Sequence, residues 1–117
     1  MEREDRIRRY YELVDGGDVP GLVELFAPDA VYRRPGYDPL VGREALTRFY
    51  RDQRVIKDGC HSLSEVVVQG NAAAVHGTFV GTLKDGRGVT LRFADFFRFA
   101  NGGPFTSRDT FFFVQLV

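Results

Sequence analysis

The stretch FADFFRF, residues 93–99, has the pattern of a half-buried β-strand that carries a carboxylic acid on its apolar face. Side chains alternate between the two faces of a strand, so Asp95 shares a face with Phe93, Phe97 and Phe99. A carboxyl group among phenylalanines is costly unless it is protonated, paired or hydrogen-bonded. Such groups are often found in functional sites. Asp95 is therefore a candidate functional residue, and an internal salt bridge to an arginine on a neighbouring strand is the structural alternative.

The residues around this stretch predict an antiparallel sheet. Turn signals at Gly70-Asn71, Asp85-Gly86 and Asn101-Gly102 divide the second half of the chain, and the last two are typical of two-residue hairpins. The sequence predicts four strands between these turns, at residues 63–68, 73–83, 88–99 and 105–117. We expect them to pair in chain order as a meander, and a further short strand is expected at residues 30–33.

The first half of the chain has the apolar period of helices. One face of a first helix carries Ile7, Tyr10, Tyr11 and Val14. This helix should end at Gly16, and Asp18 is a suitable N-cap for a second helix that ends at Pro28. A third helix should follow Gly42 and end at Gly59. Helices followed by antiparallel strands predict an α+β fold.

Composition limits the possible functions. The 117 residues are enough for one domain, residues 1–117, and the formal net charge is zero, which favours neither nucleic acid nor a membrane as a partner. Cys60 is the single cysteine, so we expect no internal disulfide and a reducing, cytoplasmic location. One Cys and two His also argue against a zinc site, and no metal or cofactor is expected.

The last predicted strand indicates how the protein assembles. Both of its faces are apolar, through Phe111, Phe112, Phe113, Val114, Leu116 and Val117. A sheet covered by helices on one face should be polar on the other. Apolar residues on both faces therefore indicate that the second face packs on another subunit. A two-fold homodimer through the sheet is the commonest arrangement of this kind.

The order of elements resembles that of a known superfamily. Gly17-Asp18 after the first helix, the segment LFAPDAV at residues 25–31, and the segment GREA at residues 42–45 that leads to Phe49-Tyr50 are similar to the nuclear transport factor 2-like superfamily. Within it, the chain resembles the branch of ketosteroid isomerases and SnoaL-like polyketide cyclases. The resemblance covers essentially the whole chain. It implies a cone of three N-terminal helices on a strongly curved antiparallel sheet, with a pocket inside.

The ketosteroid isomerase pattern is matched only in part. The resemblance implies that Tyr10 and Asp95 donate hydrogen bonds to a developing enolate oxygen as an oxyanion hole. At the family's general-base position this chain has Arg34, which cannot accept a proton. The sequence leaves open whether Arg34 binds a substrate carboxylate or an enolate, or forms an ion pair with Asp95 or Asp109.

A second comparison is with limonene-type epoxide hydrolases. The last-strand segment RDTF, residues 108–111, resembles their Arg-Asp-Tyr-Phe, and Tyr32 falls at their water-holding Tyr. Their Arg, second Asp and Asn are replaced by His76, Thr78 and Arg34. Two matches out of five argue against the complete hydrolase machinery.

The general base is left open among His76, Asp109 and water. His61 is a candidate for the pocket mouth, but a surface role is favoured for it. We expect the pocket to be lined by Val14, Tyr32, Phe49, Thr78, Phe93, Phe97, Arg108 and Phe112. A Phe-rich interior without Trp favours a flat, apolar or polycyclic ligand.

The leading hypothesis is cofactor-independent acid/base chemistry on an apolar carbonyl compound, as isomerisation, cyclisation or dehydration. Tyr10 and Asp95 would then stabilise the oxyanion, and Arg34 would orient the substrate. The alternatives are a non-catalytic ligand-binding or dimerising module, and a limonene-type epoxide hydrolase.

Overall fold

The structure is a computed structural model, and it describes residues 2–113 of the chain. Three α-helices are formed, α1 (Arg3–Asp15), α2 (Val19–Glu24) and α3 (Gly42–Arg48), and a π-helical turn, Phe49–Gln53, continues α3. Asp18 caps α2 as predicted, because its carboxylate accepts the N–H of Gly21 at 3.0 Å. Two predicted helix ends are wrong. Helix α2 already ends at Glu24, and Pro28 belongs to the strand that follows it. Gly59 does not end the third helix but lies inside a strand.

Six strands form one sheet in the order β2-β1-β6-β5-β4-β3. Their bounds are Phe26–Arg33 for β1, Leu40–Val41 for β2, Ile56–Gln69 for β3, Ala72–Leu83 for β4, Gly88–Phe99 for β5 and Phe105–Phe112 for β6. The antiparallel meander of β3 to β6 is confirmed. Strand β1 extends it by pairing in parallel with β6. The predicted apolar residues Val114, Leu116 and Val117 lie outside the described residues.

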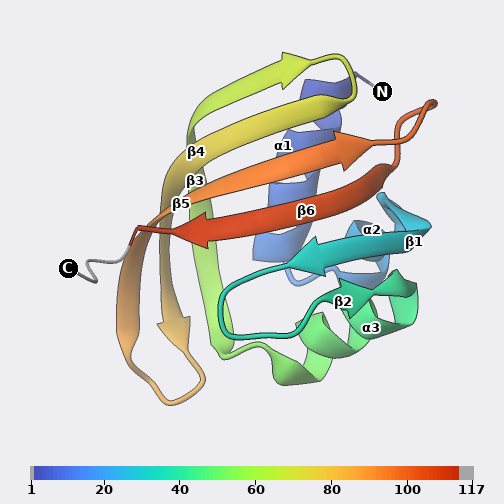
Figure 1. The fold of residues 1–117 in the computed structure, drawn as a ribbon. Coiled ribbons are helices and arrows are strands. Elements are labelled where there is room, and N and C mark those ends of the chain that lie inside the picture. The colour runs from blue at the N-terminus through green and yellow to red at the C-terminus, as the bar shows by residue number, and fades with distance from the viewer. Residues whose placement is uncertain (1, 114–117) are drawn as a thin grey trace.

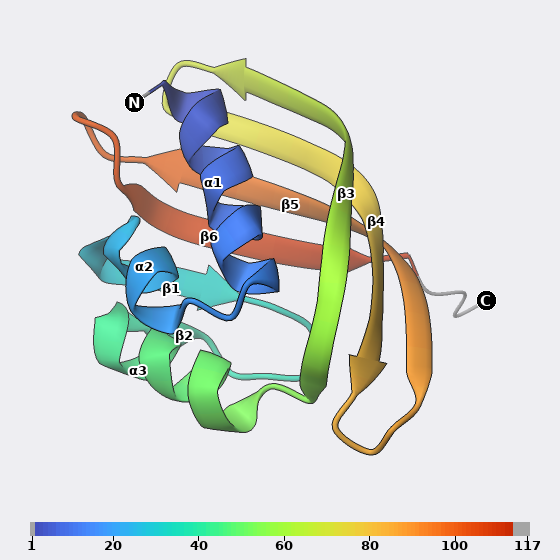
Figure 2. The ribbon, with the colours of Figure 1, turned by 180° about the vertical axis from the view of Figure 1, so that it is seen from behind.

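The sheet is strongly curved, and the helices cover its concave side (Figure 1). Seen from behind, α1 crosses the inside of β3 to β6, while α2 and α3 lie beside β1 and β2 (Figure 2). Strand β3 has two register shifts against β4, and such irregularities let a long strand bend. The expected α+β cone is therefore confirmed. No helix among residues 2–113 is long and apolar enough to cross a membrane.

Glycines give the aromatic side chains room on the concave face. A Cβ atom at Gly59 would lie 2.2 Å from the ring of Phe79, and one at Gly81 would lie 2.5 Å from the same ring. A Cβ at Gly77 would similarly lie 3.0 Å from the ring of Phe93. The rings of Phe79 and Phe93 therefore lie close to the backbone of β3 and β4 at these glycines. The arrangement leaves space above them on the inside of the cone.

The side-chain parity of β5 is as predicted, because Phe93, Asp95, Phe97 and Phe99 are all buried on the concave face. The parity expected for β4 is wrong. Val75 is the residue that pairs with Asp95 and points inward, so His76 and Thr78 lie on the outer face of the sheet. The fold therefore removes both residues from the inside of the cone.

Candidate functional site

An apolar cavity of about 420 Å³ lies on the concave side of the sheet. Its charged or polar lining groups are Arg34, His61, Arg108 and Thr110. The rest of the lining is mainly apolar and comprises Pro35, Gly36, Tyr37, Val55, Ile56, Phe79, Leu83, Val89, Leu91, Phe93 and Phe112. A cavity of this size and composition is typical of sites for small molecules.

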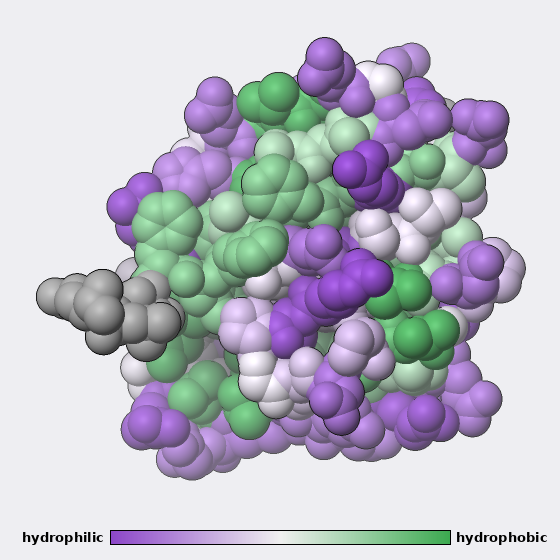
Figure 3. Space-filling model, viewed as in Figure 1, coloured by the Kyte–Doolittle hydropathy of each residue, from purple (hydrophilic) through white to green (hydrophobic). Residues whose placement is uncertain are grey.

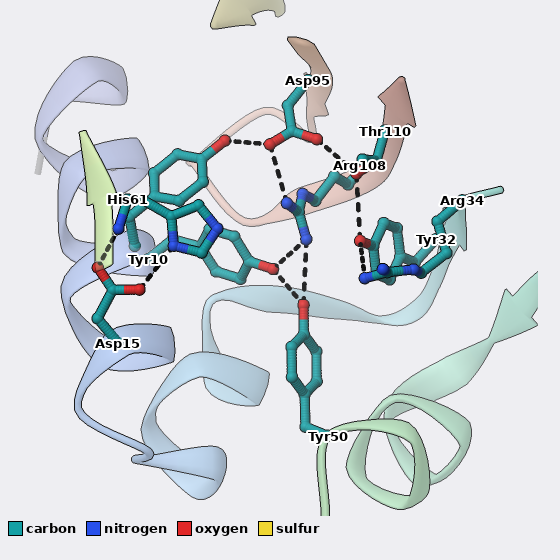
Figure 4. A network of polar contacts seen from close by, with 10 residues as sticks. Tyr10, Asp15, Tyr32, Arg34, Tyr50, His61, Asp95, Arg108 and Thr110 are labelled. Carbon is teal, nitrogen blue, oxygen red and sulfur yellow. Dashed lines mark hydrogen bonds and ion pairs between the residues drawn. The ribbon is translucent and has the colours of Figure 1, made fainter. Parts of the chain in front are cut away.

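A buried ion pair connects β5 and β6 at the cavity wall. Nη2 of Arg108 lies 2.8 Å from Oδ2 of Asp95, and the two side chains are 7% and 0% exposed. Asp95 also accepts hydrogen bonds from the hydroxyls of Tyr11 and Thr110 (Figure 4). All three partners, one of them a guanidinium, donate to the Asp95 carboxylate, so its oxygens act as acceptors in this structure. This arrangement corrects the expected role of Asp95 as a protonated donor.

Tyr10 is the other residue expected in the oxyanion hole. Its hydroxyl accepts a hydrogen bond from Nη1 of Arg108 at 2.5 Å and bonds to the hydroxyl of Tyr50. Its side chain is fully buried and does not line the cavity. Tyr11, one residue later on α1, is the tyrosine that reaches Asp95. The expected pair of Tyr10 and Asp95, both aimed at one substrate oxygen, is therefore not formed.

The tyrosines of this cluster stay protonated. Burial raises the pKa of Tyr10 and Tyr50, although the charge of Arg108 opposes the rise. Burial also raises the pKa of Tyr11, and the negative charge of Asp95 adds to the effect. For Arg108, burial lowers the pKa, but the nearby Asp95 and the tyrosines together raise it by more than this. The pKa of Arg108 is therefore well above the ordinary value. The cluster is thus one cation and one anion surrounded by neutral phenols.

Arg34 directly follows β1 and lines the cavity. Figure 4 shows its side chain next to that of Tyr32. One of its Nη atoms donates to the hydroxyl of Tyr32 at 3.1 Å. Tyr32 in turn donates to Thr110 at 3.1 Å, because the hydroxyl hydrogen of Thr110 is used by Asp95. The expected ion pairs of Arg34 with Asp95 or Asp109 are not formed, since those carboxylates bind Arg108 and Arg33 instead.

His61 forms a pair with Asp15 that the sequence did not suggest. Nδ1 of His61 lies 2.6 Å from Oδ1 of Asp15, and the other carboxylate oxygen accepts the backbone N–H of His61 at 2.8 Å. The imidazole is 11% exposed and lines the cavity. It packs against the rings of Tyr11, Phe79 and Phe93, with centroids 4.8–5.3 Å away. Within residues 2–113, its Nε2 makes no hydrogen bond.

Two of the expected bases lie outside the cavity. His76 is on the outer face, where its Nε2 lies 2.9 Å from Nη2 of Arg92. Asp109 also faces outward, and it pairs with Arg33 at 3.2 Å. Across the described residues 2–113, no three His, Cys, Asp or Glu side chains gather closely enough to hold a metal ion.

The expected pocket lining is partly correct. Phe93, Arg108 and Phe112 line the cavity. Tyr32, Phe49 and Phe97 belong to the buried core behind it, and Val14 lines a separate hollow beside Tyr50. The residues that sequence reasoning missed are Tyr11 and Asp15. The surface role favoured for His61 is wrong, because its side chain is only 11% exposed and lines the cavity. The apolar face of α1 did contain Tyr11, but only the three-dimensional packing distinguishes it from Tyr10.

Comparison with known proteins places this fold among solved structures. The sequence model of the SnoaL-like domain matches residues 7–105. An NTF2-like protein of unknown function from Burkholderia pseudomallei K96243 is 25% identical, with a TM-score of 0.87 over 97% of this chain and 92% of that one. SalBIII, an epoxide hydrolase/cyclase-like enzyme in pyran ring formation in the polyether salinomycin, is 21% identical, with a TM-score of 0.84 over 96% of this chain and 91% of that one.

Proposed function

Because this chain belongs to the family of SnoaL-like domains, in the nuclear transport factor 2-like superfamily, we propose that it is an enzyme that transfers protons on an apolar carbonyl compound. The reaction would be an isomerisation, a cyclisation or a dehydration, without a cofactor. The compound would bind in the apolar cavity, and His61 would be the general base.

The pair of Asp15 and His61 is the observation that carries this proposal. Histidine is the side chain that most often serves as a general base near neutral pH. Here Asp15 holds Nδ1 at 2.6 Å, which fixes the tautomer with the proton on Nδ1 and leaves Nε2 as the proton acceptor. The imidazole forms part of the wall of an apolar cavity. A carboxylate that orients a histidine also stabilises the imidazolium that forms when a proton is taken up.

The charges around the cavity suit the intermediate of such a reaction. His61 would remove a proton from the carbon next to the carbonyl, the C–H electron pair would form a C=C bond, and the carbonyl oxygen would become an enolate. The cation Arg108 lines the same cavity and would stabilise this negative charge. In a β,γ-unsaturated ketone, return of the proton from His61 to the γ-carbon gives the conjugated isomer. Attack of the enolate carbon on a second carbonyl, whose oxygen takes the proton from His61, gives a ring. In a β-hydroxy ketone, the hydroxyl group leaves with that proton as water and gives the enone.

Proton exchange into a simple ketone tests this proposal directly. We expect the protein to accelerate the exchange of the C1 protons of 2-tetralone in D₂O, measured by NMR. His61→Asn should lower this rate by about 10²-fold or more, the usual contribution of a positioned base. Asp109→Asn on the outer face is the matched control and should leave the rate unchanged. Exchange at the same rate in the wild type and His61→Asn would remove His61 as the base.

Chemical rescue separates catalysis from a structural role of the same histidine. In His61→Ala, added imidazole should restore part of the exchange rate, because it can occupy the space of the missing ring. A merely structural histidine would give no rescue while the thermal stability of the variant stays low.

A non-catalytic binding module is the second candidate function. The observation that favours it is that Asp95 and Tyr10 are already fully engaged by partners within the protein. If this reading holds, apolar ligands will bind in the cavity while the exchange rate remains that of the buffer.

We also propose that the protein is a homodimer through the outer face of the sheet. Phe96 and Phe111 are 50% and 53% exposed there, and their rings pack edge to face at 5.8 Å. Hydrophobic side chains gather on this face beside a band of hydrophilic ones (Figure 3). Exposed aromatic patches of this kind usually contact another protein surface. A cytoplasmic location, expected from the single cysteine, stays a prediction.

A further inference from the structure

We infer that the compound bound in the cavity carries a carboxylate that pairs with Arg34. The inference names the substrate class of the site proposed above, and it rests on that proposal for the place where the compound reacts. The substrates would be apolar or aromatic carboxylic acids with a carbonyl group remote from the carboxylate.

The charge balance of the cavity is the first observation. Three basic groups line it, and two of them have a carboxylate partner inside the protein. Arg108 is paired with Asp95, and His61 is paired with Asp15. Arg34 has no carboxylate partner among residues 2–113. A half-buried guanidinium in an apolar cavity is costly without a counter-charge, so the cavity is best matched by an anionic ligand.

The surroundings of Arg34 are the second observation. Its guanidinium carbon lies 5.0–5.9 Å from the ring centroids of Tyr32, Tyr37, Phe49 and Phe112. These faces hold the charged group in place but supply no anion. One Nη atom donates to Tyr32, Nε is buried without a partner, and the other Nη makes no hydrogen bond within the described part of the chain. A carboxylate satisfies both the charge and the free N–H donors of a guanidinium, and as a singly charged group it suits this mainly apolar cavity better than a phosphate.

The two ends of the site are separate. Figure 4 shows His61 and Arg34 on opposite sides of Arg108, although both side chains line the cavity. A ligand anchored at Arg34 therefore reaches His61 with a different part of its skeleton. The wall between them includes Phe79, Leu91 and Phe93, which suits an aromatic or alicyclic body. The carboxylate thus serves as an anchor, and the atoms that react lie at the other end.

Two isosteric probes test this inference by isothermal titration calorimetry. 2-Naphthoate and 2-naphthamide have the same shape, but only the first is an anion. We expect the naphthoate to bind at least ten times more tightly than the amide. In Arg34→Gln this difference in affinity should disappear. The variant should bind naphthoate more weakly than the wild type does, and it should bind the amide equally well. Arg33→Gln is the matched control, because Arg33 is the adjacent arginine and its exposed side chain pairs with Asp109.

Several outcomes would overturn the inference. Equal binding of the two probes to the wild type would do so, as would the absence of naphthoate binding up to millimolar concentration. A loss of naphthoate binding that is the same in Arg33→Gln and Arg34→Gln would show only a general effect of net charge. His61→Asn separates this inference from the proposed function, because it should abolish proton exchange and leave the preference for naphthoate intact.

Discussion

At the scale of single residues, the pair of Asp95 and Arg108 combines two charges in the most buried part of the sheet. Taking both ions out of water is expensive, and their attraction offsets this cost only when further hydrogen bonds complete the geometry. Here the hydroxyls of Tyr11 and Thr110 complete the carboxylate, while Tyr10 and Tyr50 accept from the guanidinium. The hydrogen bonds of Tyr10 and Tyr11 to this ion pair therefore hold α1 in position on β5 and β6.

The raised pKa values of Tyr10, Tyr11 and Tyr50 predict how stability depends on pH. The folded protein keeps these three protons, whereas an unfolded tyrosine releases its proton near pH 10. The unfolded state then binds fewer protons, so stability is fully present below about pH 10 and falls as the pH rises above it.

The measurement is an alkaline titration followed by phenolate absorbance and circular dichroism. We expect a late step in phenolate absorbance that coincides with the loss of secondary structure. In Tyr50→Phe this step should be smaller by about one third, since one of the three phenols with a raised pKa is gone. Ionisation of all tyrosines near pH 10 in a protein that remains folded contradicts the prediction.

At the scale of the elements, the glycines of β3 and β4 determine the shape of the cavity. Gly59 and Gly81 pair across the two strands, and the ring of Phe79 covers both. Side chains at these positions would occupy the space of the ring, because the new Cβ would lie far inside van der Waals contact. Phe79 would then move towards the cavity that it lines.

Gly59→Ala should therefore narrow the cavity as well as strain the sheet. Overpacking of this kind costs about 1–3 kcal/mol, so we expect a lower free energy of unfolding in urea denaturation. Naphthoate binding should weaken too. Gly88→Ala is a control for the general cost of replacing glycine in a strand, because a Cβ there would lie 4.0 Å from its nearest neighbour and the backbone has no positive φ. Unchanged binding in Gly59→Ala would show that Phe79 does not form the floor of the site.

At the scale of the whole molecule, the outer face of the sheet predicts a dimer. Sedimentation at micromolar concentration should give twice the monomer mass of 13.2 kDa. Phe111→Arg should shift the protein towards the monomer, because it places a charge in the apolar patch formed with Phe96. Glu24→Arg introduces the same residue at an exposed position on α2 and should leave the mass unchanged. A wild-type monomer at high concentration would rule out this assembly.

Much of this fold follows from local patterns in the sequence. The turn at Asp85-Gly86 and the alternation around Asp95 depend only on neighbouring residues, and both are confirmed. Arg108 and Phe112, which were expected to line the pocket, do line it. The strand pattern also predicted that Asp95 would need a partner. It did not identify Arg108, which lies 13 residues further along the chain.

Only the tertiary structure decided which residues meet in the site. Val75 lies opposite Asp95 and takes the inner face, so the adjacent His76 points outward. The pairing of β3 with β4 places His61 opposite Phe79 and therefore inward. The orientation of α1 about its own axis similarly places Tyr11, and not Tyr10, within hydrogen-bond distance of Asp95. A shift of one residue in strand pairing reverses every side chain, and this register is set by long-range packing that a local pattern cannot specify.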